Sequence, residues 1–139
     1  MALPDMAAVD WDAALEQSCG DGDFMRELLA ELHAEVRALI AQLHTEIGTT
    51  MPAASEAAWP ESIKAIKMAA HTMKGSCANL MCKQISEMAR WMEQEARDSL
   101  EKDSIPRAPF TDTVTRQLAG IDTCFTNFSD ALTSKGIPI

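Results

Sequence analysis

The chain has 139 residues, of which 47% are hydrophobic, and it carries a formal net charge of −9 with an isoelectric point near 4.7. This length and composition predict one folded domain over residues 1–139 with a substantial core. The acidic balance argues against nucleic acid as a main partner, because phosphate binding needs basic surface. We expect no membrane partner and no export, since the sequence lacks both a long apolar run and the basic n-region of a secretory signal.

The four cysteines are scattered along the chain and form no C-x-x-C pair; they are Cys19, Cys77, Cys82 and Cys124. Such scattering favours free thiols in a reducing compartment over a disulfide framework. We therefore expect a cytoplasmic protein, present also in the nucleus if the source is a eukaryote.

The first half of the chain predicts two helices. Asp10 can cap a short helix that carries Trp11, and Asp21 or Asp23 can begin a long second helix. The apolar residues of the second helix recur at spacings of three and four: Met25, Leu28, Leu32, Val36, Leu39, Leu43 and Ile47. The stretch GTTMPAAS at 48–55 predicts a break after it.

The second half predicts three more helices. One begins between Ser55 and Pro60, where proline is accepted in a first turn. Its core seam is Ile63, Ile66, Ala70, Met73, Cys77 and Leu80, and the next helix has Ile85, Met88, Ala89, Met92, Ala96 and Leu100. The two prolines in DSIPRAPFT, 103–111, predict a linker. The final helix carries Val114, Leu118, Ile121, Phe125, Phe128 and Leu132, and it ends at Lys135 and Gly136.

Four long amphipathic helices joined by short polar links predict an all-α fold, an antiparallel four-helix bundle with a short extra N-terminal helix across one end. His33 and His44 lie among glutamates on the second helix and are expected on the surface. Neither belongs to an inward-facing ligand pair, so no metal site is predicted. The sequence contains no nucleotide-binding loop, which indicates that the domain has no ATP site of its own.

A second stripe runs beside the core seam of the third helix and consists of Lys64, Lys67, His71, Lys74, Gly75 and Ala78. His71 lies about 100° around the axis from the seam and should be exposed. Glycine costs about 1 kcal/mol in a helix interior, but Gly75 leaves the surface beside the imidazole open. An exposed imidazole is largely neutral at pH 7 and hence nucleophilic, and Lys74 and Lys67 provide positive charge for a phosphoryl group.

Each of these features has an ordinary explanation when taken singly. A lone histidine is usually a surface residue, a helical glycine can allow close helix packing, and a row of lysines can be a solvated face. Their coincidence on one strip favours a reactive site that receives a phosphoryl group held by another protein.

The segment AHTMKGSCANL, residues 70–80, resembles the signature of histidine-containing phosphotransfer (HPt) domains, the carriers of multistep two-component phosphorelays. The early segment VDWDAALEQSCGDGDFMRELLAEL is also similar to that family. Met81 and Cys82 stand where the family commonly has Gly-Ala, and glycine there suits a left-handed turn. Either Asn79 forms that turn instead, or the helix runs on.

The resemblance implies roles for individual residues. His71 is the expected phosphoacceptor, Lys74 stabilises the phosphoryl group, and Gly75 gives the partner access. Ser76 supports the segment through a local hydrogen bond. On the next helix, Glu93 and Arg97 match positions near the histidine, and Glu93 can orient the ring through its second nitrogen.

The resemblance also implies a function. The domain accepts a phosphoryl group on His71 from a receiver-domain aspartate and passes it to another receiver, acting as a phosphocarrier and not as an enzyme. Its partners would be receivers of response regulators and hybrid histidine kinases, which supply Mg²⁺, while the domain itself needs no cofactor and is a monomer. The alternatives are a docking module without chemistry and the HPt part of a larger histidine kinase. Met68 and the stem of Lys64, exposed beside His71 by their spacing on the helix, are the expected docking residues; the alternative for Met68 is that the short first helix covers it.

Overall fold

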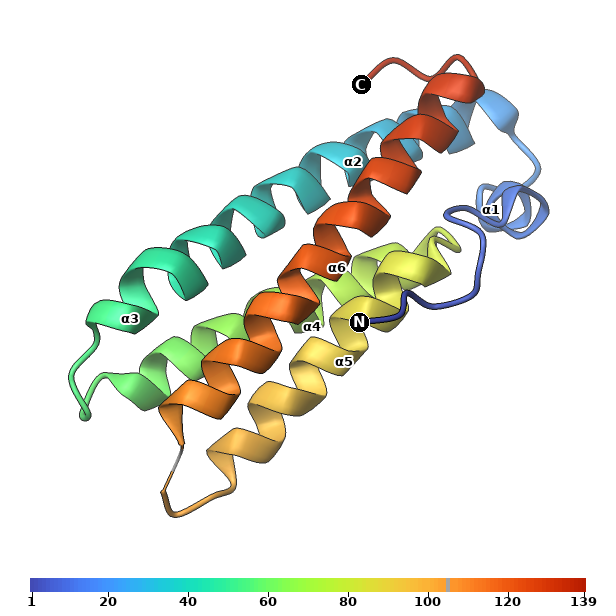
Figure 1. The fold of residues 1–139 in the computed structure, drawn as a ribbon. Helices are drawn as coiled ribbons and strands as arrows, with labels where there is room; N and C mark the ends of the chain where they lie inside the picture. Colours follow the sequence, from blue (N-terminus) through green and yellow to red (C-terminus); the bar gives the residue numbers. More distant parts are fainter. Residues whose placement is uncertain (105) are drawn as a thin grey trace.

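The computed structural model describes residues 1–104 and 106–139, and all regular structure within these ranges is helical (Figure 1). The four long helices are α2 (Gly22–Thr45), α4 (Trp59–Asn79), α5 (Lys83–Leu100) and α6 (Arg107–Ser134). They run side by side in alternating directions, while the short α1 (Trp11–Gln17) lies at one end (Figure 1). The predicted antiparallel bundle with a short extra helix is confirmed. In the described ranges, none of the helices has the length and apolar character needed to cross a membrane.

The first two helices begin where their capping residues predict. Asp10 Oδ1 accepts a hydrogen bond from the backbone N–H of Ala13 at 3.2 Å, and Asp21 Oδ1 accepts one from Phe24 at 3.1 Å. Each carboxylate satisfies a backbone N–H that has no partner within the first turn of its helix. Of the two candidate starts of α2, Asp21 is therefore the cap.

The predicted break at 48–55 is wrong in its first part. The long second helix continues through a π-helical turn, η1 (Glu46–Thr50), into α3 (Met51–Ala53), and the chain leaves the helix only at Ala54. A proline ring clashes with the preceding carbonyls of a regular α-helix. The wider turn just before Pro52, where Met51 N–H bonds to the Glu46 carbonyl, accommodates this ring.

The core lies between the four long helices and is mostly aliphatic, with methionine, cysteine and a few aromatic side chains among its members. As predicted from the seam of α4, Ile66, Met73 and Cys77 are fully buried.

The linker predicted at 103–111 is shorter than expected, because α6 already begins at Arg107 and holds Pro109 in its first turn. Within that linker, Ile105 lies outside the described residues.

The four cysteines carry free thiols, as predicted. Burial raises the pKa of Cys82 to about 12 and that of Cys124 to about 11, and it also raises the pKa of Cys77 well above its ordinary value. These three thiols are therefore packing groups and are poor nucleophiles at neutral pH.

The turn between α4 and α5 differs from both predicted alternatives. Met81 itself adopts the left-handed conformation, with φ of 60°. Cys82 N–H bonds to the Cys77 carbonyl at 2.9 Å and Met81 N–H to the Ala78 carbonyl at 3.1 Å, which is a Schellman motif. A left-handed non-glycine residue costs about 1–2 kcal/mol. Packing of the half-buried Met81 side chain against the core, and a hydrogen bond from Asp10 N–H to its carbonyl, offset this cost.

The expectation that His33 lies on the surface is wrong. Its ring is 2% exposed, stacks on Phe125 with centroids 4.6 Å apart, and has Nε2 2.7 Å from the Ser129 hydroxyl. The glutamates around it in sequence face outward, whereas His33 faces α6. His44 is exposed, as predicted, and pairs with Asp122 at 3.0 Å.

The buried His33 predicts a pH-dependent stability. Burial, and secondarily the charge of Arg37, lower the pKa of His33 below 6.5. The unfolded chain therefore binds a proton at a pH where the folded chain does not, so the free energy of unfolding should fall as pH drops from about 7.5 to about 5.5. Urea denaturation at the two pH values measures this change. In His33→Gln the dependence should flatten; an equally steep dependence in that variant would assign it to another group.

Candidate functional site

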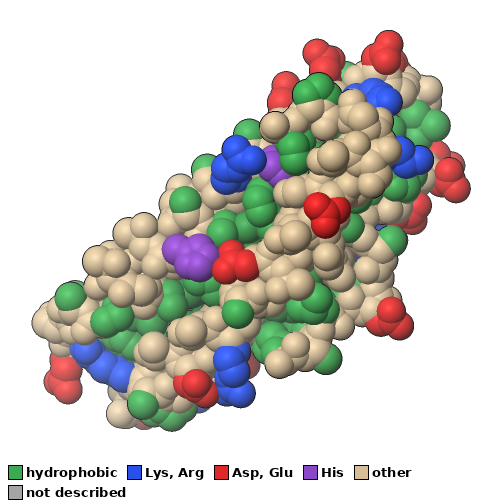
Figure 2. Space-filling view, turned by 45° about the horizontal axis from the view of Figure 1, so that its top comes forward, with side chains coloured by type: hydrophobic (Ala, Val, Ile, Leu, Met, Phe, Trp, Pro, Cys, Tyr) green, Lys and Arg blue, Asp and Glu red, His purple; other side chains and the backbone are tan. Residues whose placement is uncertain are grey.

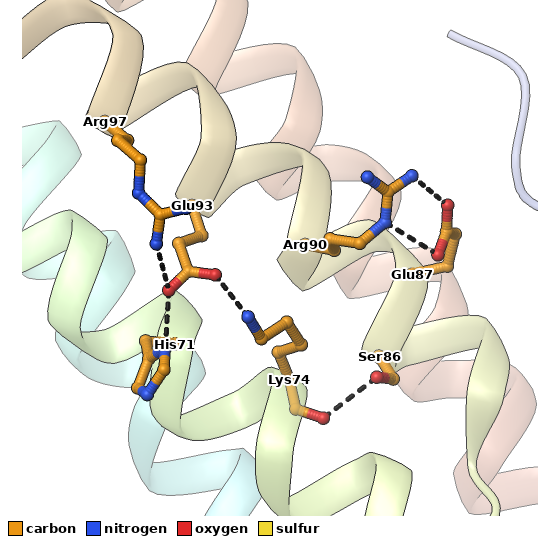
Figure 3. Close-up of polar contacts among 7 residues, drawn as sticks. All are labelled: His71, Lys74, Ser86, Glu87, Arg90, Glu93 and Arg97. Atoms are coloured by element: carbon orange, nitrogen blue, oxygen red, sulfur yellow. Dashed lines mark hydrogen bonds and ion pairs between the residues drawn. The ribbon is translucent and has the colours of Figure 1, made fainter.

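His71 lies on the outer side of α4 with its side chain 59% exposed, as the stripe beside the core seam predicts. The ring is not free to turn, because its Nδ1 lies 2.5 Å from Glu93 Oε2 on the neighbouring α5 (Figure 3). One nitrogen of the imidazole is thus held against the protein while the ring remains open to solvent.

Glu93 is the buried centre of a charged cluster. Its side chain is 3% exposed, and its carboxylate faces Lys74 Nζ at 2.6 Å and Arg97 Nη2 at 3.5 Å as well as His71 (Figure 3). Burial by itself would raise the pKa of Glu93, but the hydrogen bonds from Lys74 and His71 and the charges on both hold that pKa below its ordinary value. The carboxyl group is therefore ionised at neutral pH.

An ionised carboxylate can only accept hydrogen bonds. The proton between Glu93 and His71 must therefore belong to Nδ1 of the ring, which leaves the lone pair of a neutral imidazole on Nε2. In Figure 3 this second nitrogen points away from Glu93, and it has no hydrogen-bond partner among the described residues. The site therefore presents an oriented, exposed nitrogen nucleophile whose developing positive charge a buried carboxylate can stabilise.

Lys74, the residue expected to stabilise a phosphoryl group, is held by a contact within the protein. Its side chain is only 31% exposed, and its ammonium group contacts Glu93, so it is not a free surface charge. Lys67, half-buried one turn before His71, remains a candidate for contact with a phosphoryl group. Lys64 pairs with Glu61 at 3.1 Å and does not join the Glu93 cluster.

Lys74→Ala should therefore cost stability as well as transfer. The change removes one charged partner from a buried carboxylate, which retains His71 and Arg97, so we expect a loss of about 1.5 kcal/mol in the free energy of unfolding. A chemical denaturation curve measures it. The control is Lys67→Ala, for which we expect a change within about 0.5 kcal/mol. Equal stability of the two variants would show that the Lys74–Glu93 contact contributes nothing.

Gly75 is not required for helix packing. A Cβ atom at this position would meet no heavy atom within 4 Å, whereas a Cβ at Gly120, where α6 crosses α5, would lie 2.6 Å from Met88 Cε. Gly120 thus marks a close helix contact, and Gly75 faces open space next to His71. This geometry supports the interpretation that Gly75 leaves room for a partner.

Two hydrogen bonds flank Gly75. Ser76 Oγ donates to Glu35 Oε1 on α2 at 2.8 Å. The family resemblance implied a local hydrogen bond for Ser76, but this bond reaches a different helix. Ser86 Oγ on α5 donates to the backbone carbonyl of Lys74 at 2.9 Å (Figure 3). Sequence reasoning missed both Glu35 and Ser86. The available signal for Ser86 was its spacing of seven residues from Glu93, which places both on one face of α5.

Met68 is 63% exposed on α4, three residues before His71. It is therefore not covered by α1, and it remains an exposed apolar side chain beside the His71 ring. On the face shown in Figure 2, histidine side chains lie next to acidic and basic side chains. His44 also pairs with a carboxylate, but it has no neighbouring lysine stripe, which distinguishes it from His71.

A helical bundle that presents one oriented histidine beside lysines and an exposed glycine has the features of a phosphate-accepting module. The family model of the Hpt domain matches residues 24–124, and the chain belongs to this family. Hpt domains are phosphocarrier modules of phosphorelays rather than kinases, and they interact with receiver domains. No curated protein matches the sequence significantly.

Proposed function

We propose that this protein is a phosphorelay carrier in which His71 accepts a phosphoryl group from the aspartate of one receiver domain and passes it to the aspartate of another. The observation that supports this most directly is the contact between His71 Nδ1 and the buried carboxylate of Glu93, which leaves Nε2 of this exposed side chain pointing away from Glu93 (Figure 3).

The transfer is a displacement at phosphorus. The lone pair on His71 Nε2 forms the N–P bond as the P–O bond of the aspartyl phosphate breaks, and the receiver aspartate leaves as a carboxylate. The proton on Nδ1 stays in place, and Glu93 stabilises the positive charge that the ring acquires. Positioning and charge stabilisation account for most of the catalysis in such transfers. Mg²⁺ belongs to the receiver, and this chain contributes no cofactor.

The test is transfer of label from a receiver domain carrying radioactive aspartyl phosphate. The wild-type protein should acquire label that is stable to base and lost in acid. His71→Gln should acquire none, and His44→Gln, which removes the other exposed histidine paired with a carboxylate, should be labelled like the wild type. An unlabelled wild-type protein, with receivers shown to be active toward another carrier, would favour the docking-module alternative; label in His71→Gln would place the acceptor elsewhere.

The docking prediction concerns Met68. We propose that receivers contact the face of α4 around His71, where Met68 provides apolar area and Lys64 and Lys67 provide charge. Met68→Glu should weaken receiver binding about tenfold, and binding should also weaken as salt rises. Calorimetric titration measures both effects.

The matched control is Met6→Glu, since Met6 is another exposed methionine, at 43%, but belongs to the N-terminal segment. It should bind like the wild type. Equal affinity of Met68→Glu and wild type would show that the receiver docks on a different face.

A further inference from the structure

The polar contacts between α4 and α5 near the site form a short ladder (Figure 3). Lys74 takes part in two of its steps: its backbone carbonyl accepts from Ser86 Oγ at 2.9 Å, and its Nζ donates to Glu93 Oε1 at 2.6 Å. Ser86 and Glu93 are seven residues apart and so lie about two turns apart on the same face of α5. The third step is the contact from Glu93 to His71.

The register between the two helices decides whether Glu93 reaches the ring. Sliding α5 along α4 by a single residue would move Glu93 by about 1.5 Å, enough to break a contact of this length. The buried side chains between the helices include Met73, Met88 and Met92, and apolar packing of flexible methionines is not directional. A directional bond to the main chain close to the site defines the register more strictly than this packing does.

The bond from Ser86 is of this kind. It joins a side chain of α5 to the main chain of α4, so it is insensitive to the rotamer of Lys74. It also holds the peptide unit directly before Gly75, where α4 lacks a side chain and is intrinsically weaker. Ser86 is half-buried, so water competes with this bond less than at an exposed position.

We propose that Ser86 is a positioning residue of the phosphotransfer site: its hydrogen bond to the Lys74 carbonyl sets the α4–α5 register that places Glu93 on Nδ1 of His71. The proposal rests on the proposed function of His71. Ser86 itself touches neither the phosphoryl group nor the reacting nitrogen.

The test compares Ser86→Ala with Ser86→Thr, which retains the hydroxyl group, and with Ser99→Ala, which alters a buried serine of α5 that makes none of the three contacts of the ladder. Two quantities are measured for each variant. The first is the ¹⁵N NMR spectrum of the His71 ring, which reports the fraction protonated on Nδ1 without any phosphorylation. The second is the maximal rate of transfer from a phosphorylated receiver, kept separate from its KM.

Ser86→Ala should lower the maximal rate about tenfold, with little change in KM. A 1 Å displacement of a catalytic group can lower a rate roughly 10²-fold, and we expect a smaller displacement of Glu93 here. Its His71 spectrum should shift toward a mixture of the two ring tautomers. Ser86→Thr should keep the wild-type tautomer and most of the rate, and Ser99→Ala should keep both.

Wild-type tautomer and rate in Ser86→Ala would overturn the proposal. So would equal rate losses in Ser86→Ala and Ser99→Ala with unchanged spectra, since that result would show a general loss of packing. If the wild-type protein accepts no phosphoryl group at all, the proposed function fails, but the NMR comparison still decides whether Ser86 sets the position of Glu93.

Discussion

Glu93→Ala should reduce phosphotransfer about 10²-fold, at the lower end of the range for a positioned acid–base group. The substitution removes the acceptor that keeps the proton on Nδ1 of His71, so the ring can turn and can place its proton on Nε2, where it blocks attack. It also removes the negative charge that stabilises the ring as the N–P bond forms. Single-turnover transfer from a phosphorylated receiver measures the rate.

The fold should survive this change. Lys74 and Arg97 lose their shared partner, but both side chains are exposed enough to turn to solvent, so we expect a loss of about 1–3 kcal/mol in the free energy of unfolding. Glu93→Gln is the matched variant, because its amide oxygen still accepts from Nδ1 while the charge is absent. Its rate should lie between those of wild type and Glu93→Ala. A wild-type rate in Glu93→Ala would mean that the carboxylate has no part in transfer.

Gly75→Gln should slow transfer at least tenfold while making the protein more stable. A glutamine side chain at this position covers surface beside His71 and obstructs an approaching receiver. The size of the loss in rate depends on how far the receiver can change its conformation to avoid the glutamine. Removing a glycine from an exposed helix interior stabilises it by up to about 1 kcal/mol. Transfer kinetics and thermal denaturation together measure the opposite changes.

Two controls separate access from packing. Gly75→Ala should give the same stabilisation with a smaller effect on the rate, because its methyl group meets no other atom within 4 Å. Gly120→Ala should stabilise less than Gly75→Ala, since its methyl group has to displace the flexible end of the buried Met88 side chain. Unchanged transfer in Gly75→Gln would show that the glycine does not serve partner access.

The apolar periodicity was enough to predict the bundle, the seam of α4 and the exposure of His71, because these depend on which face of a helix is covered. It did not predict the burial of His33, whose neighbours Glu31 and Glu35 suggested an exposed stretch. Those glutamates lie two residues away on either side, which on a helix is a different face. The continuation of α2 through Pro52 was also missed, because a proline normally ends a helix and a π-helical turn has no reliable sequence signal.

The sequence predicted which residues belong to the candidate site better than it predicted the contacts between them. The strip of α4 identified His71, Lys74 and Gly75 from spacing alone. That Lys74 bonds to Glu93 depends on the register between two helices, and a single sequence carries little information about register. Met81 shows the same limit, since its left-handed conformation follows from the requirements of the turn and not from a preference of methionine.

Every group of the Glu93 cluster belongs to one helical hairpin, from His71 on α4 to Arg97 on α5. Contacts between segments so close along the chain require little loop-closure entropy, and structures rich in such contacts form quickly during folding. During translation, both helices of the hairpin are also synthesised before α6. The reactive centre should thus be able to assemble at an early stage of folding, while α6, which closes the core, adds stability afterwards.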